Sequence, residues 1–205
     1  EAGDFGGTRN GAVFHWPKRI KAKGEVRDQF SHVIDVAPTV LDLAGIPEPE
    51  YVNGVEQVPM QGASLAYTFD NANAEERRKT QYFEMMGNRG IYHDGFMASC
   101  FHGKVPWVRF GSVPFDGPQE SWELYDVRDD FSQSHDLADE RPELLAEMQD
   151  LFHAECLRNG AYPLRDSAFI RDPAVRVPRA PSGVRRMTYT TAHVRMPEHA
   201  VLNIK

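Results

Sequence analysis

The sequence predicts an α/β fold that ends in a small subdomain of about four antiparallel strands and one C-terminal helix. Short runs rich in aromatic and β-branched residues between positions 81 and 127 have the composition of strands. The pair Asp94-Gly95 separates two of these runs, and it is a strong signal for a two-residue hairpin. The segment 142–158 has the length and apolar spacing of an amphipathic helix, and residues 35–44 predict another helix ahead of the sheet.

The first elements lie near the start of the chain. Residues 11–15 predict a short apolar strand, which ends before Pro17 because proline has no backbone N–H for a ladder. Residues 35–44 predict a helix with Asp35 as the candidate N-cap and Gly45 at its end. The apolar surface of this helix is supplied by Val36, Val40, Leu41 and Leu43.

The sheet and the last helix follow in the second half. Strands are expected at 81–85, 90–93, 96–100 and 122–127. A type I′ turn at Asp94-Gly95 requires positive φ at both central residues. The helix at 142–158 starts on a proline, which suits a first turn, and stops at Asn159-Gly160. One of its faces should cover the sheet, and this face contains Leu145, Met148, Phe152 and Cys156.

Composition excludes some classes of function. The chain has 205 residues, 41% of them hydrophobic, and we find no apolar stretch long enough for a membrane segment. Residues 1–162 hold 15 Lys and Arg against 27 Asp and Glu, so we expect no nucleic-acid partner. Residues 163–205 reverse the balance, with 8 against 3. This tail either wraps the acidic body or a neighbouring subunit, or is a poorly ordered extension.

A series of motifs runs along the chain in a fixed order. It begins with Gly6-Gly7-Thr8-Arg9 and continues with the segment 31–47, which reads SHVIDVAPTVLDLAGIP. The later members are Val52-Asn53-Gly54, Gly62-Ala63-Ser64-Leu65, the segment 81–95, Trp122-Glu123-Leu124-Tyr125-Asp126 and Asp136-Leu137-Ala138. Together these motifs resemble the C-terminal part of sulfatases of the alkaline phosphatase superfamily, close to the arylsulfatases.

The resemblance implies an order of domains. Residues 1–47 would form the C-terminal edge of the large alkaline-phosphatase-like α/β domain, and residues 48–80 would connect it to the small α+β subdomain at 81–162. Residues 163–205 would form a Pro/Arg-rich extended tail. We therefore expect the chain to be a portion of a longer protein, with an N-terminal sulfatase half as its partner. Nothing in the sequence indicates a cellular compartment.

The resemblance also implies the chemistry of the full-length protein, a sulfuric ester hydrolase acting on sulfate esters, with aryl sulfates as the expected substrates. Such enzymes attack with a formylglycine made from Cys or Ser in a Cys/Ser-x-Pro-x-Arg motif, and a divalent cation, usually calcium, orients the ester. Cys100 and Cys156 lack the required proline, and the motif at Ser112 ends in Asp116 instead of arginine. We therefore expect no catalytic residue, no metal ligand and no activity in this chain alone. The sulfate-binding lysine that the resemblance implies is expected just upstream of residue 1, because no lysine precedes Arg9 in this sequence.

Four residues are candidates for the substrate rim or for its support. The guanidinium of Arg9 is a rigid fork that suits sulfate or carboxylate oxygens, although a structural ion pair is the alternative. Asn88, Arg89 and His102 are the other three candidates, because amide, guanidinium and imidazole groups can bind the oxygens of an ester. Two buried free thiols are expected at Cys100 and Cys156.

Other polar residues have a structural interpretation. His32 and Asp35 have the residue types of an acid/base pair, but capping and packing explain them better. The basic run Arg77-Arg78-Lys79 is expected on a solvated face.

Two alternatives to a sulfatase stay open at this point. One is a phosphodiesterase or phosphonate hydrolase of the same superfamily, which the upstream nucleophile and metal ligands would distinguish. The other is a non-catalytic binding module, which would bind a ligand without turnover even with the N-terminal half restored.

Overall fold

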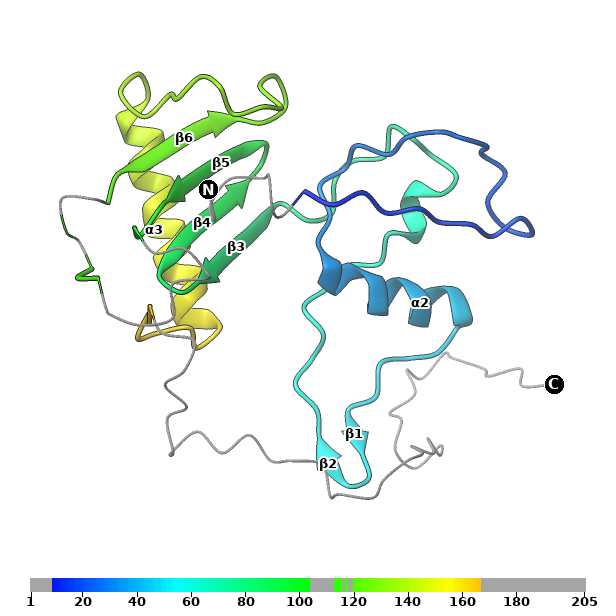
Figure 1. The fold of residues 1–205 in the computed structure, drawn as a ribbon. Coiled ribbons are helices and arrows are strands. Elements are labelled where there is room, and N and C mark those ends of the chain that lie inside the picture. The colour runs from blue at the N-terminus through cyan, green and yellow to red at the C-terminus, as the bar shows by residue number, and fades with distance from the viewer. Residues whose placement is uncertain (1–8, 104–112, 116, 118–119, 167–205) are drawn as a thin grey trace. The chain divides into compact units, whose positions relative to one another are not determined.

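The computed structural model describes residues 9–103, 113–115, 117 and 120–166 (Figure 1). The predicted tail at 163–205 lies almost wholly outside these residues. The described chain divides into two compact units. Residues 9–13 and 79–166 form the sheet unit, and residues 14–78 form the helix unit.

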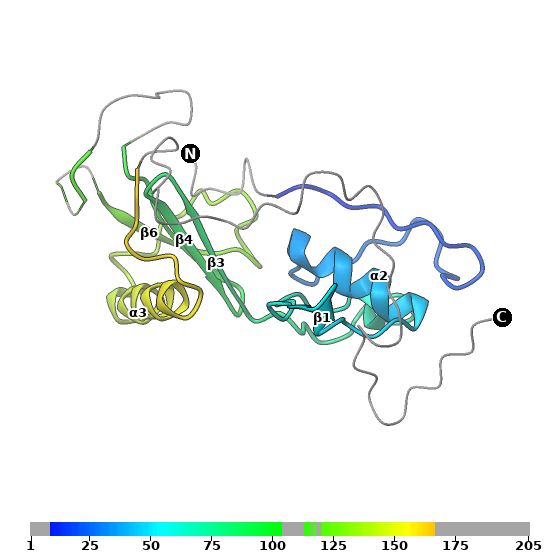
Figure 2. The same cartoon turned by 90° about the horizontal axis from the view of Figure 1, so that it is seen from below.

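The sheet unit contains the predicted antiparallel sheet with its covering helix. Its strands pair in chain order and are β3 (Thr80–Met85), β4 (Asn88–His93), β5 (Phe96–Cys100) and β6 (Trp122–Asp126). Helix α3 (Pro142–Arg158) lies across one face of this sheet, as the two ribbon views show (Figures 1 and 2). The prediction of four antiparallel strands and one C-terminal helix is confirmed.

Two-residue turns set the register of the sheet. Asp94 and Gly95 have φ values of 43° and 89°, and His93 pairs with Phe96 on either side of them. Positive φ at both central residues is what a type I′ turn requires, so the predicted hairpin is confirmed. A second turn of this kind, at Met86-Gly87, joins β3 to β4, and it extends β4 by two residues beyond the predicted start at 90.

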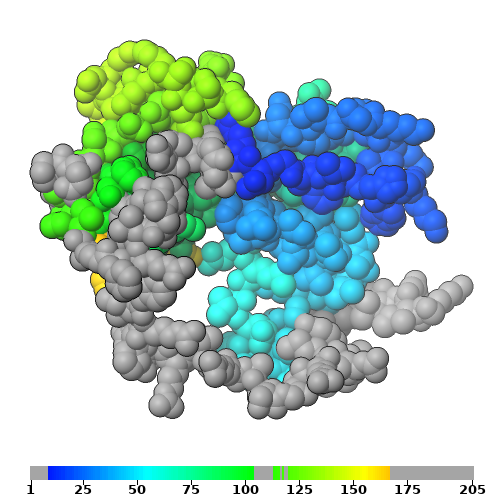
Figure 3. Space-filling view, viewed as in Figure 1, coloured from blue at the N-terminus to red at the C-terminus, as the bar shows by residue number. Residues whose placement is uncertain are grey.

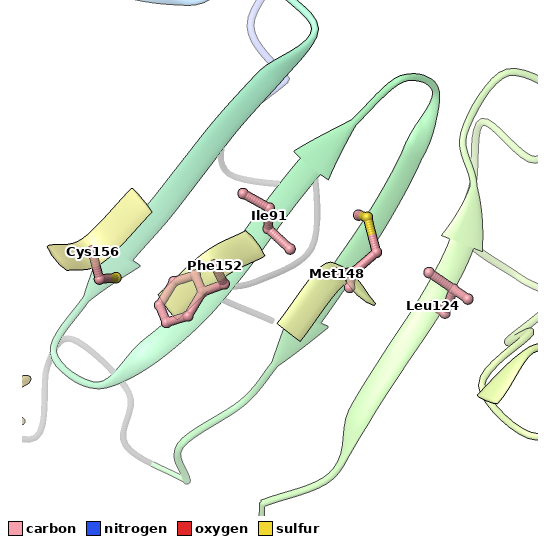
Figure 4. Close-up of a cluster of buried hydrophobic side chains, with 6 residues drawn as sticks. Ile91, Leu124, Met148, Phe152 and Cys156 are labelled. Carbon is pink, nitrogen blue, oxygen red and sulfur yellow. The ribbon is translucent and has the colours of Figure 1, made fainter. Parts of the chain in front are cut away.

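The core of the sheet unit lies between the sheet and α3. Ile91, Ala98 and Leu124 are successive cross-strand partners, so their side chains form a row on one face. Figure 4 shows the side chains that meet there, and the buried cluster is Ile91, Ala98, Leu124, Met148, Phe152 and Cys156. The predicted apolar face of α3 is therefore confirmed. Among the described residues, no helix combines the length and apolar composition needed to cross a bilayer.

An irregular segment leads along the chain from the sheet unit into the helix unit. Residues 11–15 form no strand, which corrects the prediction, because an apolar run alone supplies no neighbouring strand to pair its backbone. A 3₁₀ turn at Val33–Asp35 leads directly into α2 (Val36–Ala44), and a second 3₁₀ turn lies at Ala66–Thr68. Between them, the short strands β1 (Tyr51–Val52) and β2 (Val55–Glu56) pair as a hairpin.

Helix α2 is apolar on its outer side. Val36 and Val40, which the sequence assigns to the apolar surface, are exposed, and so is Val33 one turn earlier. The buried residue of the helix is Thr39, whose Oγ1 donates to the Asp35 carbonyl (2.6 Å) and accepts from the Leu65 amide (2.8 Å). Gly45 ends the helix with φ of 65°, as expected.

The interior of the helix unit is held by a buried ion pair. Asp35 is fully buried at the start of α2, and its carboxylate accepts from the Nε of Arg78 (2.9 Å) and from the amides of His32 (2.8 Å) and Ala63 (2.7 Å). Burial by itself would raise the pKa of Asp35, but these hydrogen bonds outweigh it and hold the pKa below its ordinary value.

Arg78, a member of this ion pair, and the neighbouring His32 test two of the structural interpretations made from the sequence. The Arg78 side chain is only 9% exposed, so the expectation of a solvated face is wrong for this residue. Arg78 is buried because the buried carboxylate of Asp35 requires a charged partner. His32 caps the 3₁₀ turn, in agreement with the capping interpretation.

Candidate functional site

Three of the four candidate residues lie together in the sheet unit. Asn88 and Arg89 begin β4, and His102 follows the end of β5. Since β4 and β5 are antiparallel neighbours, the start of one strand lies beside the end of the other, and Arg89 pairs directly with Cys100. All three side chains are buried, and we refer to them together with Cys100, Glu120 and Asp166 as the polar cluster.

Arg89 is the positive centre of the polar cluster. Its Nη2 lies 2.6 Å from Oε2 of Glu120 and donates to Sγ of Cys100 at 3.3 Å. The guanidinium also lies over the ring of Trp122, 5.5 Å from the centroid. Burial by itself would lower the pKa of Arg89, but Cys100 and the hydrogen-bonded Glu120 outweigh it and raise the pKa above its ordinary value. Arg89 therefore stays charged.

His102 is enclosed on several sides. Its Nδ1 shares a hydrogen bond with Oε1 of Glu120, and its ring stacks on Phe115 with centroids 4.1 Å apart. A Cβ built on Gly87 would lie 2.4 Å from the imidazole, so the turn before β4 must carry a glycine here for this reason as well as for its φ of 85°. The other ring nitrogen, Nε2, lies 4.0 Å from Oδ2 of Asp166 and has no hydrogen-bond partner in the described structure.

Asn88 connects the backbone around this imidazole. Its Oδ1 accepts from the backbone amide of His102 at 3.0 Å, and its Nδ2 donates to the Met85 carbonyl at 2.9 Å. The amide therefore fixes the turn before β4 and the residues after β5 to each other. Both contacts are local to the sheet unit.

Arg9 lies elsewhere in the sheet unit, where its side chain contacts the loop that follows β6. Its Nη1 donates to the Phe131 carbonyl at 2.9 Å, and the guanidinium sits 3.8 Å from the centroid of the Phe131 ring. Figure 3 shows the blue start of the described chain against this yellow-green loop. Partial burial lowers the pKa of Arg9. The structure therefore brings together Asn88, Arg89 and His102, and places Arg9 apart from them.

Sequence reasoning missed Glu120 and Asp166. Neither belongs to a motif that predicts burial, and both follow Pro- or Gly-rich stretches that read as loops. Their roles depend on contacts across 18 and 64 positions of the sequence, to the single residue His102. A lone His two residues after a strand gives no signal for such partners.

The residues described by the structure do not fit the divalent cation that the resemblance implies. No group of three or more His, Cys, Asp and Glu side chains in this part of the chain could hold a metal ion. The carboxylates of the polar cluster are engaged instead with Arg89, His102 and the Val113 amide. The polar cluster can hold segments of the backbone together through its buried charged side chains, but it presents no ligand set for calcium.

Comparisons with known proteins identify the family to which the sequence of this chain is similar. A family model described as N-sulphoglucosamine sulphohydrolase, C-terminal, matches residues 7–157. An uncharacterized sulfatase of Schizosaccharomyces pombe is 29% identical over 146 residues, which cover 70% of this chain and 24% of that protein. The chain thus spans about a quarter of the length of this relative.

Two solved structures show the extent of the structural likeness. One is BT4656 in complex with its substrate D-glucosamine-2-N,6-O-disulfate, with a TM-score of 0.49, 23% identity, and coverage of 72% of this chain and 28% of that one. The other is a putative sulfatase from Bacteroides thetaiotaomicron, with a TM-score of 0.44, 20% identity, and coverage of 62% and 24%.

Proposed function

The chain belongs to the family described as N-sulphoglucosamine sulphohydrolase, C-terminal, and from this premise we propose that it is the C-terminal portion of a sulfatase that hydrolyses sulfate esters. The match over residues 7–157 is the observation that supports the proposal most. Aryl sulfates are the proposed substrates, as the motif resemblance implies. The formylglycine nucleophile and the cation, calcium by resemblance, would belong to an N-terminal half.

The outer side of α2 supports a partner of this kind. Val33 and Val40 are 76% and 59% exposed, and Val36 between them is also exposed, so three valines form one stripe at helical spacing. We call these three residues the valine stripe. Its burial would contribute about 25 cal/mol per Å² of apolar area. We propose that the large α/β domain of the N-terminal half covers it.

The polar cluster has a supporting role in this proposal. Because Asn88, Arg89 and His102 are buried, we propose that they act on a substrate indirectly, through the residues that they hold ahead of β6, namely Phe115 and Glu120. Arg9 would support the loop at Phe131 in the same way. Each is thus proposed as a residue that positions the rim of the pocket, with no direct part in bond cleavage.

The test compares the chain alone with the chain joined to its N-terminal half. We expect no release of sulfate from an aryl sulfate by the chain alone at any calcium concentration, and turnover when both halves are present. Assays with a phosphate diester and a phosphonate ester run in parallel, because faster turnover of either would favour the alternative hydrolases. Binding without turnover of any ester by the joined protein would refute the proposal.

A matched pair of variants tests the covering of the valine stripe. Val40→Glu places a charge in the stripe, and we expect it to prevent productive association of the halves. Val58→Glu changes an equally apolar residue outside the stripe, which is 84% exposed, and we expect near-normal turnover. Equal activity of the two variants would show that the stripe is not the contact.

A further inference from the structure

Residues 11–15 are an exposed, mostly apolar segment whose backbone has no partner in the described structure. They read Gly-Ala-Val-Phe-His and precede the turn at 17–19, and the dark-blue start of the described chain runs extended before this turn (Figure 1). We propose that this segment is an interior strand of a β-sheet whose other strands belong to the N-terminal half. The inference rests on the proposed function for the identity of that partner, and it concerns a contact separate from the valine stripe.

The backbone of the segment provides the main argument. Within the residues that the structure describes, no N–H or C=O group of residues 11–15 takes part in a hydrogen bond. The next backbone bonds along the chain lie in the turn, where the Trp16 carbonyl accepts from the amides of Arg19 and Ile20. Backbone groups of folded proteins are almost always paired, and a run with the composition of a strand pairs in a ladder. The segment therefore has the composition of a strand and lacks only a neighbour.

The side chains indicate a strand that is covered on both faces. Ala12, Val13 and Phe14 are consecutive apolar residues, and all three are exposed. Phe14 packs on Phe69, with ring centroids 5.5 Å apart, whereas Val13 is 95% exposed, and alternation places it on the opposite face of an extended chain. An apolar run without alternating polar residues is typical of strands buried on both faces of an α/β sheet.

The segment that follows has the opposite character. Lys18, Lys21 and Lys23 are all exposed, so this part of the chain carries charge where it faces water. Lysine and proline are also the residues that keep an open strand from pairing with another chain. Residues 11–15 contain neither of them. Nothing in their composition opposes the addition of a neighbouring strand.

The N-terminal half is the partner that fits these observations. The S. pombe sulfatase has about three quarters of its length outside the region that matches this chain. The four strands of the sheet unit pair with one another in chain order, and residues 11–15 are not among them. A second copy of this chain would add one strand beside the segment without a layer to cover it. A large α/β domain supplies both the neighbouring strands and the layers on the two faces of its sheet.

Amide hydrogen exchange, resolved to single residues by fragmentation in the mass spectrometer, measures this pairing. The chain alone is compared with the chain joined to its N-terminal half. In the chain alone, we expect the amides of Val13, Phe14 and His15 to exchange at nearly their intrinsic rates. In the joined protein, we expect protection to rise at least about a hundredfold at all three, because the strands of a core sheet open only with much of the domain. Amides of β4 show that the sheet unit is folded in both samples.

Two proline variants of the joined protein separate backbone pairing from a general effect on folding. Val13→Pro removes a ladder donor, and proline is not tolerated between two neighbouring strands. Protection at Phe14 and His15 should therefore fall about tenfold or more. Val26→Pro is the matched control, because Val26 is 82% exposed and lies in an irregular segment. Protection of residues 13–15 in this control should equal that of the parent.

The outcomes distinguish this inference from the proposed function. Turnover of an aryl sulfate by the joined protein, with residues 13–15 still unprotected, refutes the strand and leaves the sulfatase. Protection of all three amides without turnover supports the strand and refutes the sulfatase.

Two further results would overturn the proposal. Protection in the chain alone that rises with its concentration assigns the pairing to a second copy. Protection of alternate amides only indicates an edge strand, because an edge strand pairs on one side. If Val13→Pro fails to fold, the comparison of the chain alone with the joined protein still decides.

Discussion

Replacing Phe152 with alanine should remove the largest single contribution to the core of the sheet unit. Phe152 is fully buried in α3, and its ring meets Trp122 edge-on at 5.7 Å and Tyr82 at 6.4 Å. A buried Phe→Ala change costs about 3–5 kcal/mol, which combines lost transfer energy with the cavity that remains. The sheet on one side is fixed by its hydrogen-bonded ladder, so collapse cannot fill that cavity, and we expect the upper half of this range.

Urea unfolding followed by near-UV circular dichroism and tryptophan fluorescence measures this loss, since the Trp122 indole touches the deleted ring. With a slope of about 1–3 kcal/mol per M, a loss of about 4 kcal/mol lowers the midpoint by about 1.3–4 M. Leu157→Ala is the matched control on the same helix, because Leu157 is 71% exposed. That change should stay within about 0.5 kcal/mol.

Equal midpoints and equal slopes for Phe152→Ala and the parent would refute the two-layer architecture, because a fully buried ring cannot be removed without cost. A lower slope with an unchanged midpoint would indicate a change in the compactness of the unfolded chain instead. The two results are distinguishable in one titration.

Two further substitutions and one labelling experiment test the structure. Gly95→Val should lower stability by about 1 kcal/mol or more, because φ there is 89° and a Cβ would lie 2.4 Å from the Arg128 side chain; thermal unfolding measures it. Burial raises the pKa of Cys156 to about 11, so a disulfide reagent at pH 8 should label it only as fast as the protein opens, unlike a free thiol peptide. Asp35→Asn should cost about 3–5 kcal/mol above pH 5, since it breaks a buried pair. Because the pKa of Asp35 is lower in the folded state than in the unfolded chain, the stabilisation by its charge is present above the unfolded pKa of about 3.9 and is lost as the pH falls further. The difference from wild type should then shrink in acid, and a constant difference would contradict the ion pair.

The sheet unit could be predicted because its determinants are local. Aromatic and β-branched runs define strands, and Asp94-Gly95 supplies the positive φ of the hairpin at low cost. The register follows from that turn, and the register places Ile91, Ala98 and Leu124 on the face that α3 covers. The turn at Met86-Gly87 was missed, because methionine is not typical of a position with positive φ.

Other features depend on partners far away in the sequence. A strand at 11–15 needs a neighbour that its own composition cannot supply. Arg78 is buried because it pairs with Asp35, which lies 43 positions earlier in the sequence. The run of three basic residues that contains Arg78 predicts the opposite, an exposed side chain. The polar cluster is of the same kind, since Glu120 and Asp166 acquire their role only through His102.

Helix α2 has a buried polar residue on its inner side and exposed valines on its outer side, and this inversion has a physical consequence. Asp35 and Thr39 satisfy their buried polar atoms through hydrogen bonds, while Val36 and Val40 gain nothing from their exposure. Hydrogen bonds fix the position of α2. Each contributes only about 0.5–1.5 kcal/mol to the free energy of unfolding. Apolar burial is the larger source of stability in a folded domain. A helix held in place by polar contacts, with its valines still exposed, is therefore prepared for a further apolar surface, and covering the valine stripe should raise the stability of the helix unit more than that of the sheet unit.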